Sequence, residues 1–148
     1  MTAIQTGTPP ARLEPPSRPR RMLGPGVSAL GASAFVLAVH VVDPNEPGSF
    51  PTCPWLLITG TWCPGCGTMR ATRALSEGDV GTALARNPVA VIAFVAMAVG
   101  FVNWTFRMWT GRPKKRLAPA WVLYTVLGAI LAFWVLRNVP GWTWLSPL

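Results

Sequence analysis

The sequence is poor in charge, and acidic residues are especially scarce. Only 12% of its 148 residues are charged, with five acids and a single histidine. A soluble domain carries about 25% charged residues, so this chain has roughly half the usual share. This composition excludes a coiled coil, a disordered chain and an ordinary soluble enzyme domain. The sequence also lacks a Ser-His-Asp order and a paired-carboxylate site, which argues against conventional hydrolase chemistry.

Basic residues are more numerous, and they occur in short clusters between long apolar runs. Lysine and arginine together number 13, the formal net charge is +8, and 51% of the residues are apolar. Proteins that bind nucleic acid place such charge on a polar surface, so nucleic acid is not an expected partner. The composition instead predicts a membrane protein whose first partner is the lipid bilayer.

Three charge-free runs predict transmembrane helices, over residues 22–42, 87–106 and 117–136. Each is long enough to cross a hydrocarbon core of about 30 Å at about 1.5 Å of rise per residue. A fourth charge-free run, residues 47–69, is so rich in proline and glycine that it predicts a loop rather than a span. We therefore expect an all-α integral membrane protein with three transmembrane helices and a short exoplasmic helical cap.

The remaining segments are assigned by their charge. We expect a disordered basic cytoplasmic tail over residues 1–21. A basic cytoplasmic loop is expected over residues 107–116, and an exoplasmic tail over residues 137–148. With the N-terminus inside, nine of the 13 basic residues are cytoplasmic and four are exoplasmic. Cytoplasmic segments retain an excess of Lys and Arg, so we expect a multi-pass protein of the bacterial inner membrane with its C-terminus outside. A cleaved signal peptide is the alternative for residues 1–42, but His40 makes a poor cleavage site.

The cap, residues 43–86, contains all three cysteines of the sequence. Cys53, Cys63 and Cys66 follow the spacing C-x9-C-x2-C. Two short interfacial helices are expected after them, over residues 69–76 and 80–86. Between these helices, Glu77-Gly78-Asp79 combines a helix stop with an N-cap residue.

The cysteine motif and its surroundings resemble a known bacterial family. The relevant residues are Cys53-Pro-Trp, Gly60-Thr-Trp-Cys-Pro-Gly-Cys-Gly-Thr-Met-Arg-Ala, Glu77-Gly-Asp and Asn87-Pro. They are similar to the membrane family catalogued as domain of unknown function 2752, whose small members carry Cys-Pro-x-Cys-Gly, Thr-Arg, Gly-Asp and an Asn-Pro helix start. Met69 departs from the family's usual threonine. The resemblance spans about residues 53–95 and implies the architecture described above, with no established activity.

Three interpretations of the cysteines are open. As a redox pair, Cys63 would attack, Cys66 would resolve and Cys53 would serve as exchange partner, because a Cys-x-x-Cys before a helix favours the thiolate. As a metal site, the three cysteines would supply three of the four ligands that zinc takes, with His40 or Asp43 completing the set. As a staple, a disulfide from Cys53 to Cys63 or to Cys66 would close the loop.

Arg70 and Arg73 lie on one face of the expected helix 69–76. They would bind an anionic head group or a phosphorylated substrate, or form ion pairs with Glu77 and Asp79. Because all four charges lie within ten residues, we favour the ion pairs.

The leading functional hypothesis is a non-catalytic accessory or scaffold component of a membrane complex, with a cap ordered by a disulfide or a metal. The spans hold only His40 and Asn103 as strongly polar side chains, which argues against transport. Such a protein needs no cofactor, although zinc is an alternative, and its partners would be other membrane-protein subunits. The alternative function is a membrane thiol–disulfide oxidoreductase that uses Cys63 and Cys66.

Overall fold

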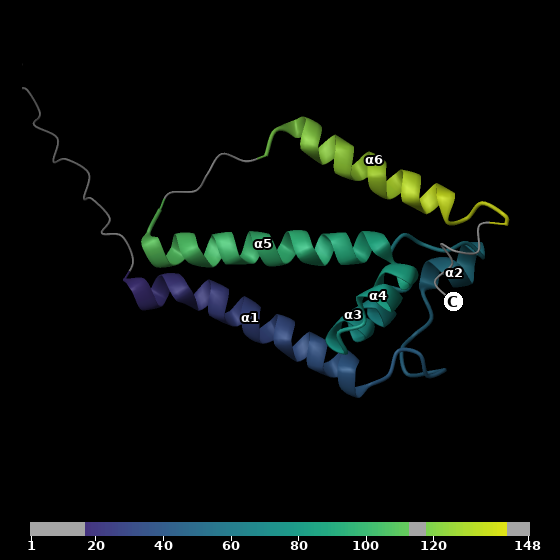
Figure 1. The fold of residues 1–148 in the computed structure, drawn as a ribbon, viewed down its shortest axis with the longest axis horizontal. Helices are drawn as coiled ribbons and strands as arrows, with labels where there is room; N and C mark the ends of the chain where they lie inside the picture. The colour runs from purple at the N-terminus through teal and green to yellow at the C-terminus, as the bar shows by residue number, and fades with distance from the viewer. Residues whose placement is uncertain (1–16, 113–117, 142–148) are drawn as a thin grey trace, which may run out of the picture.

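The computed structural model describes residues 17–112 and 118–141, and the described residues are helical with no strand. The expected tails and basic loop therefore fall partly outside the described residues, at 1–16, 113–117 and 142–148. The six helices are shown in Figure 1. Their bounds are α1 Arg18–Val41, α2 Pro54–Thr59, α3 Thr68–Ser76, α4 Val80–Arg86, α5 Pro88–Thr110 and α6 Ala120–Leu136.

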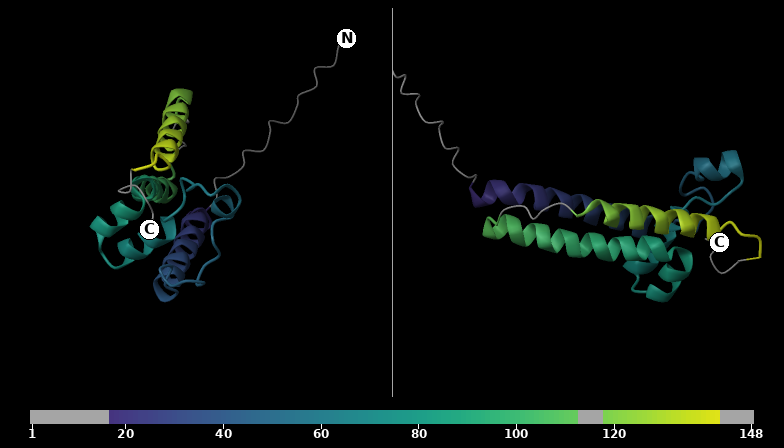
Figure 2. Two further views of the ribbon diagram at one scale, coloured as in Figure 1. Left: turned by 90° about the vertical axis from the view of Figure 1, so that its right-hand side faces the viewer. Right: turned by 90° about the horizontal axis from the view of Figure 1, so that it is seen from above.

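Helices α1 and α5 form the long axis of the molecule. They pack side by side, and both are long and apolar enough to cross a membrane. Only 11% of the apolar window of each helix is buried inside the chain, so most of their apolar surface faces outward. Helix α6 is apolar too, but with 17 residues it is shorter than α1 and α5 and is not one of the two candidate spans. It lies on the far side of α5 from α1 (Figures 1 and 2). By length and composition, α1 and α5 are thus the two candidate membrane spans among the described residues.

Helix α1 begins at Arg18, four residues before the charge-free run that predicted it. Residues 18–21 are therefore helical and do not belong to a disordered tail. Because of the earlier start, Pro25 lies inside the helix, where it is buried. Pro19 occupies the first turn, where a missing N–H is tolerated. At the same end of the bundle, α5 continues to Thr110, into the expected cytoplasmic loop (Figure 1).

The α3–α4 hairpin packs between the ends of α1 and α5 (Figure 1). Its core is built from small residues, with Ala71, Ala74 and Ala83 buried against Val91 of α5. Gly78 turns the chain with a φ of 81°, a value that favours glycine. Asp79 then caps α4, because its side chain accepts a hydrogen bond of 2.9 Å from the Thr82 amide.

A third short helix, α2, lies in the proline- and glycine-rich run that predicted only loop. Cys53 precedes it as N-cap, Pro54 occupies its first turn, and Gly60 ends it with a φ of 68°. The breakers thus flank a six-residue helix instead of interrupting it. The cap contains three short helices rather than the expected two. Trp55 of α2 meets Trp134 of α6 edge to face at 5.4 Å.

Candidate functional site

The three cysteines meet in the loop between α2 and α3. Their Sγ atoms all lie within 4.8 Å of one another. Cys63 Sγ is 3.5 Å from Cys53 Sγ and 3.0 Å from Cys66 Sγ. All three are free, half-buried thiols. With these side lengths the sulfurs form a compact triangle, and the angle at Cys63 is no wider than about a right angle.

A tight turn brings Cys63 and Cys66 together. The Cys66 amide donates to the Cys63 carbonyl at 3.1 Å, and the Thr68 amide donates to Gly65 at the same distance. Gly67 follows with a φ of 84° and leads into α3. The short spacing of the two cysteines and the glycines around them thus place both thiols on one side of a single turn.

Asn87 holds this turn from the start of α5, and it is only 1% exposed. Its Nδ2 donates to the carbonyls of Pro64 at 2.9 Å and Cys66 at 3.2 Å, and contacts Thr68 Oγ1 at 3.3 Å. Its Oδ1 accepts a hydrogen bond from the Ala90 amide at 3.0 Å. One side chain therefore caps α5 and satisfies buried carbonyls of the cysteine turn.

Arg137 holds the same turn from the end of α6. Its Nη1 donates to the carbonyls of Cys63 and Cys66, both at 3.1 Å. The guanidinium lies over the Phe133 ring at 4.9 Å, and the residue is 3% exposed. Among the described residues, Nε and Nη2 of Arg137 find no hydrogen-bond partner. An arginine buried in this way is costly unless a negative charge lies nearby.

Asn138 completes the attachment of α6 to the cap. Its Oδ1 accepts from the Trp62 amide at 2.8 Å, while its Nδ2 donates to the Trp62 carbonyl at 2.8 Å. The same Nδ2 donates to the Trp134 carbonyl at 2.9 Å. The residue before Cys63 is therefore fixed through both of its backbone polar groups. The expected exoplasmic tail begins with two residues that pack into the cap.

The three thiols have different electrostatic surroundings. Backbone N–H groups at the start of α2, chiefly that of Leu56, lower the pKa of the Cys53 thiol. Burial raises the pKa of the Cys66 thiol to about 12, and hydrogen bonding with Cys63 adds to the effect. Burial lowers the pKa of Arg137, and this is opposed by the negative charge that Cys66 and Cys63 carry as thiolates. Cys53 is thus the better placed of the two shifted thiols to ionise.

A cavity of about 450 Å³ opens beside the cysteines. Cys53 and Cys66 line it on one side, together with Leu56, Trp62 and Arg70. Solvent and small ligands can therefore approach two of the three sulfurs.

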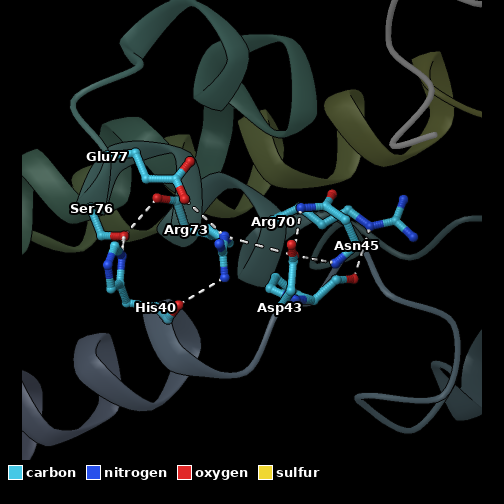
Figure 3. Close-up of polar contacts among 8 residues, drawn as sticks. His40, Asp43, Asn45, Arg70, Arg73, Ser76 and Glu77 are labelled. Carbon is cyan, nitrogen blue, oxygen red and sulfur yellow. Dashed lines mark hydrogen bonds and ion pairs between the residues drawn. The ribbon is translucent and has the colours of Figure 1, made fainter.

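The other residues considered from the sequence lie in a separate polar cluster at the end of α1 (Figure 3). Arg73 contacts Glu77 at 2.9 Å and Asp43 at 3.7 Å, and its Nη1 donates to the His40 carbonyl at 2.8 Å. Arg70 donates from Nε to the Pro44 carbonyl at 3.3 Å. Asp79 caps α4, although the sequence grouped it with these arginines.

His40 also belongs to this polar cluster and not to the sulfur triangle. Its Nδ1 lies 3.0 Å from Ser76 Oγ. Because the Ser76 hydroxyl donates to the Arg73 carbonyl at 2.7 Å, the histidine N–H is the donor to Ser76. Among the described residues, the group of close metal-ligand side chains consists of the three cysteines, without His40 or Asp43.

Sequence reasoning missed Asn87, Arg137 and Asn138 as site residues. Asn87 was recognised only as the start of a helix. Arg137 is one of the four basic residues expected outside, because a long basic side chain at the end of an apolar run usually extends to the membrane interface.

The comparison with known families finds a match, and it covers the cysteine turn and the start of α5. Residues 53–101 match the family described as "Protein of unknown function (DUF2752)", which confirms the resemblance seen in the motifs. The match runs from the first cysteine into α5 and includes Asn87, while Arg137 and Asn138 lie beyond it. No curated protein and no solved structure matches the chain.

Proposed function

We propose that the chain is a three-span inner-membrane protein with a cytoplasmic N-terminus and an exoplasmic C-terminus. The 17 residues of α6 correspond to a length of about 26 Å, at the lower limit for a span. The C-terminal ends of α1 and α6 and the N-terminal end of α5 all contact the cap, as alternating spans require. The nine-to-four division of basic residues supports the orientation.

A pair of fusions tests this topology. Alkaline phosphatase fused after residue 148 should be active, because the enzyme folds only outside the cytoplasm, and a fusion after residue 112 should be inactive. Equal activity of the two fusions would contradict the third span.

We further propose a non-catalytic role as an accessory component of a membrane assembly. The observation that carries this role is the attachment of the cysteine turn by Asn87, Arg137 and Asn138. These contacts fix the cap to two of the long helices and make it a rigid platform. The largely exposed apolar faces of α1 and α5 supply surface for lipid or for other subunits.

Native complexes extracted in mild detergent test the accessory role. The tagged protein should migrate as part of a larger assembly with reproducible membrane subunits. Asn138→Ala, which loosens the cap, should weaken that assembly, and Thr125→Ala on α6 should not, because Thr125 bonds only within its own helix. A solitary, monodisperse wild-type protein would count against the role.

Thiol–disulfide exchange is the second candidate, favoured by the 3.0 Å approach of Cys63 Sγ and Cys66 Sγ. A Cys63–Cys66 disulfide would accept two electrons and two protons from a substrate dithiol, which becomes a disulfide. Alkylation of intact cells followed by mass spectrometry should then find the pair partly oxidised, and the Cys63→Ser variant should accumulate reduced exported proteins. Fully reduced cysteines and unchanged exported proteins would eliminate this candidate.

A further inference from the structure

We propose that Cys53, Cys63 and Cys66 bind one thiophilic metal ion, Zn²⁺, with Arg137 compensating the charge of the centre. This proposal rests on the proposed function, a cap held in a fixed structure, and adds that a metal ion contributes to that order. Because the purified chain alone can be tested for metal binding, the result does not depend on whether a membrane assembly exists.

The sulfur triangle has the dimensions of a metal site. A zinc–thiolate bond of about 2.3 Å in tetrahedral geometry places neighbouring sulfurs about 3.8 Å apart. The observed separations of 3.0 Å and 3.5 Å are shorter than this value and the third is at most 4.8 Å, so the three sulfurs are close enough to share one ion. If Cys53 instead exchanged with a Cys63–Cys66 disulfide, the attacked Cys63 Sγ would lie in line between the other two sulfurs. The near-right or smaller angle at Cys63 suits a shared ion better than such an exchange.

Charge provides the second, independent observation. Three thiolates and one Zn²⁺ leave one net negative charge, and a guanidinium balances it. Arg137 is 3% exposed, and its Nε and Nη2 lack partners among the described residues. Its Nη1 bonds the carbonyls of two of the three proposed ligands. Arg137 is therefore a positioning residue that orients two ligands and supplies the counter-charge.

The fourth coordination position is left to an exogenous ligand. His40 is bonded to Ser76, and Asp43 lies against Arg73 and Asn45, so neither joins the triangle. The cavity beside Cys53 and Cys66 admits water or another small ligand. On binding, three thiols release three protons to solvent and form three Zn–S bonds, with no change of oxidation state.

The test uses the full-length protein, purified in mild detergent under anaerobic, reducing conditions. Elemental analysis should find about one zinc per chain. After chelation, Co²⁺ should give intense sulfur-to-cobalt charge-transfer bands with the visible bands of tetrahedral cobalt, and added Zn²⁺ should abolish them. Each Cys→Ser variant should bind metal far more weakly. His40→Gln and Asp43→Asn should bind normally, because both residues lie outside the triangle.

Arg137 is tested by the same titration. Arg137→Gln should weaken zinc binding by roughly 10–100-fold, as is typical when a partner of metal ligands is lost. Arg137→Lys should recover part of the affinity because it restores the charge. Equal loss in both variants would reject charge compensation.

The wild-type titration keeps the proposal falsifiable even if the variants fail to fold. Folded wild-type protein with three free thiols that binds neither Co²⁺ nor Zn²⁺ would overturn it. So would a disulfide between any two of the cysteines in cells alkylated before lysis, because that bond removes two ligands. A fourth protein ligand, revealed by loss of metal in the His40 or Asp43 variant, would also overturn the proposed coordination.

Discussion

Asn87 performs two functions that can be separated by substitution. Its oxygen caps α5, and its amide nitrogen serves carbonyls of the cysteine turn. Asn87→Ala should destabilise the protein by about 2–3 kcal/mol, the sum of a lost cap and the loss of the donor to the Pro64 carbonyl, whereas the Cys66 carbonyl keeps its bond from Arg137. Thermal and denaturant unfolding in detergent, followed by circular dichroism, measures the change. Asn103→Ala is the matched control, because Asn103 bonds only within α5.

The aspartate variant distinguishes the two functions. Asn87→Asp preserves an oxygen for the Ala90 amide but places a carboxylate beside the carbonyls of Pro64 and Cys66. We expect it to be at least as unstable as Asn87→Ala. Wild-type stability in Asn87→Asp would show that the cap alone matters.

The sequence predicts some of these residue roles and misses others for a physical reason. Gly78, Asp79 and the capping oxygen of Asn87 act within their own turns, so a local pattern reveals them. The amide nitrogen of Asn87 acts about 20 residues away, on the cysteine turn, and no local pattern reveals that role. Arg137 and Asn138 act across more than 70 residues of chain, on the backbone of residues 62–66. Backbone carbonyls carry no sequence signature, so no local pattern identifies this kind of partner.

At the scale of elements, the α3–α4 turn depends on its backbone conformation. Gly78 has a φ of 81°, whereas Gly81 lies inside α4. Gly78→Ala should cost about 1–2 kcal/mol, because a Cβ is unfavourable in the left-handed region. Gly81→Ala should be neutral or slightly stabilising, since alanine favours a helix and its Cβ would meet Asp79 Oδ1 at an ordinary 3.5 Å. Unfolding curves of the two variants that coincide would contradict this assignment.

The cap of α4 gives the hairpin a defined pH dependence. Hydrogen bonds from Thr82 lower the pKa of Asp79 below its ordinary value of 3.8. A lowered folded-state pKa contributes stability above the unfolded value, and this stability is lost as pH falls through the folded value. Wild type should therefore lose Tm relative to Asp79→Asn on acidification below about pH 4, because asparagine caps without titrating. A Tm difference between the two proteins that is independent of pH would contradict the role of the carboxylate. The Glu46→Gln variant is the control for the general effect of removing one negative charge.

Proline alone does not fix where a helix begins or whether a segment contains one. Pro19 and Pro25 both fit a helix start, and α1 uses the earlier one. In residues 47–69, proline and glycine correctly exclude a span. They do not exclude α2, because Pro54 and Gly60 lie at its two ends, where each is favourable.

At the scale of the whole molecule, α6 is joined to the rest chiefly at its cap end. Asn138 bonds both backbone groups of Trp62, and Trp134 meets Trp55. Helix α1, by contrast, packs along α5 and against α3. The cysteine turn is therefore the point at which the third long helix is coupled to the other two.

This coupling predicts a local response to Asn138→Ala. The Trp62 amide, which donates to Asn138 Oδ1 at 2.8 Å, should exchange its hydrogen roughly tenfold faster, because a bond worth about 1 kcal/mol or somewhat more is lost. Exchange should also quicken at the C-terminal end of α6. The amide of Ala71, in the buried hairpin core, should keep its protection, since that core forms from α3, α4 and α5 without α6.

Hydrogen-exchange mass spectrometry in detergent measures all three regions, with Thr125→Ala as the α6 control. Uniform loss of protection across the hairpin would mean that the cap depends on α6 for its fold, whereas confined loss supports α6 as a separately attached element.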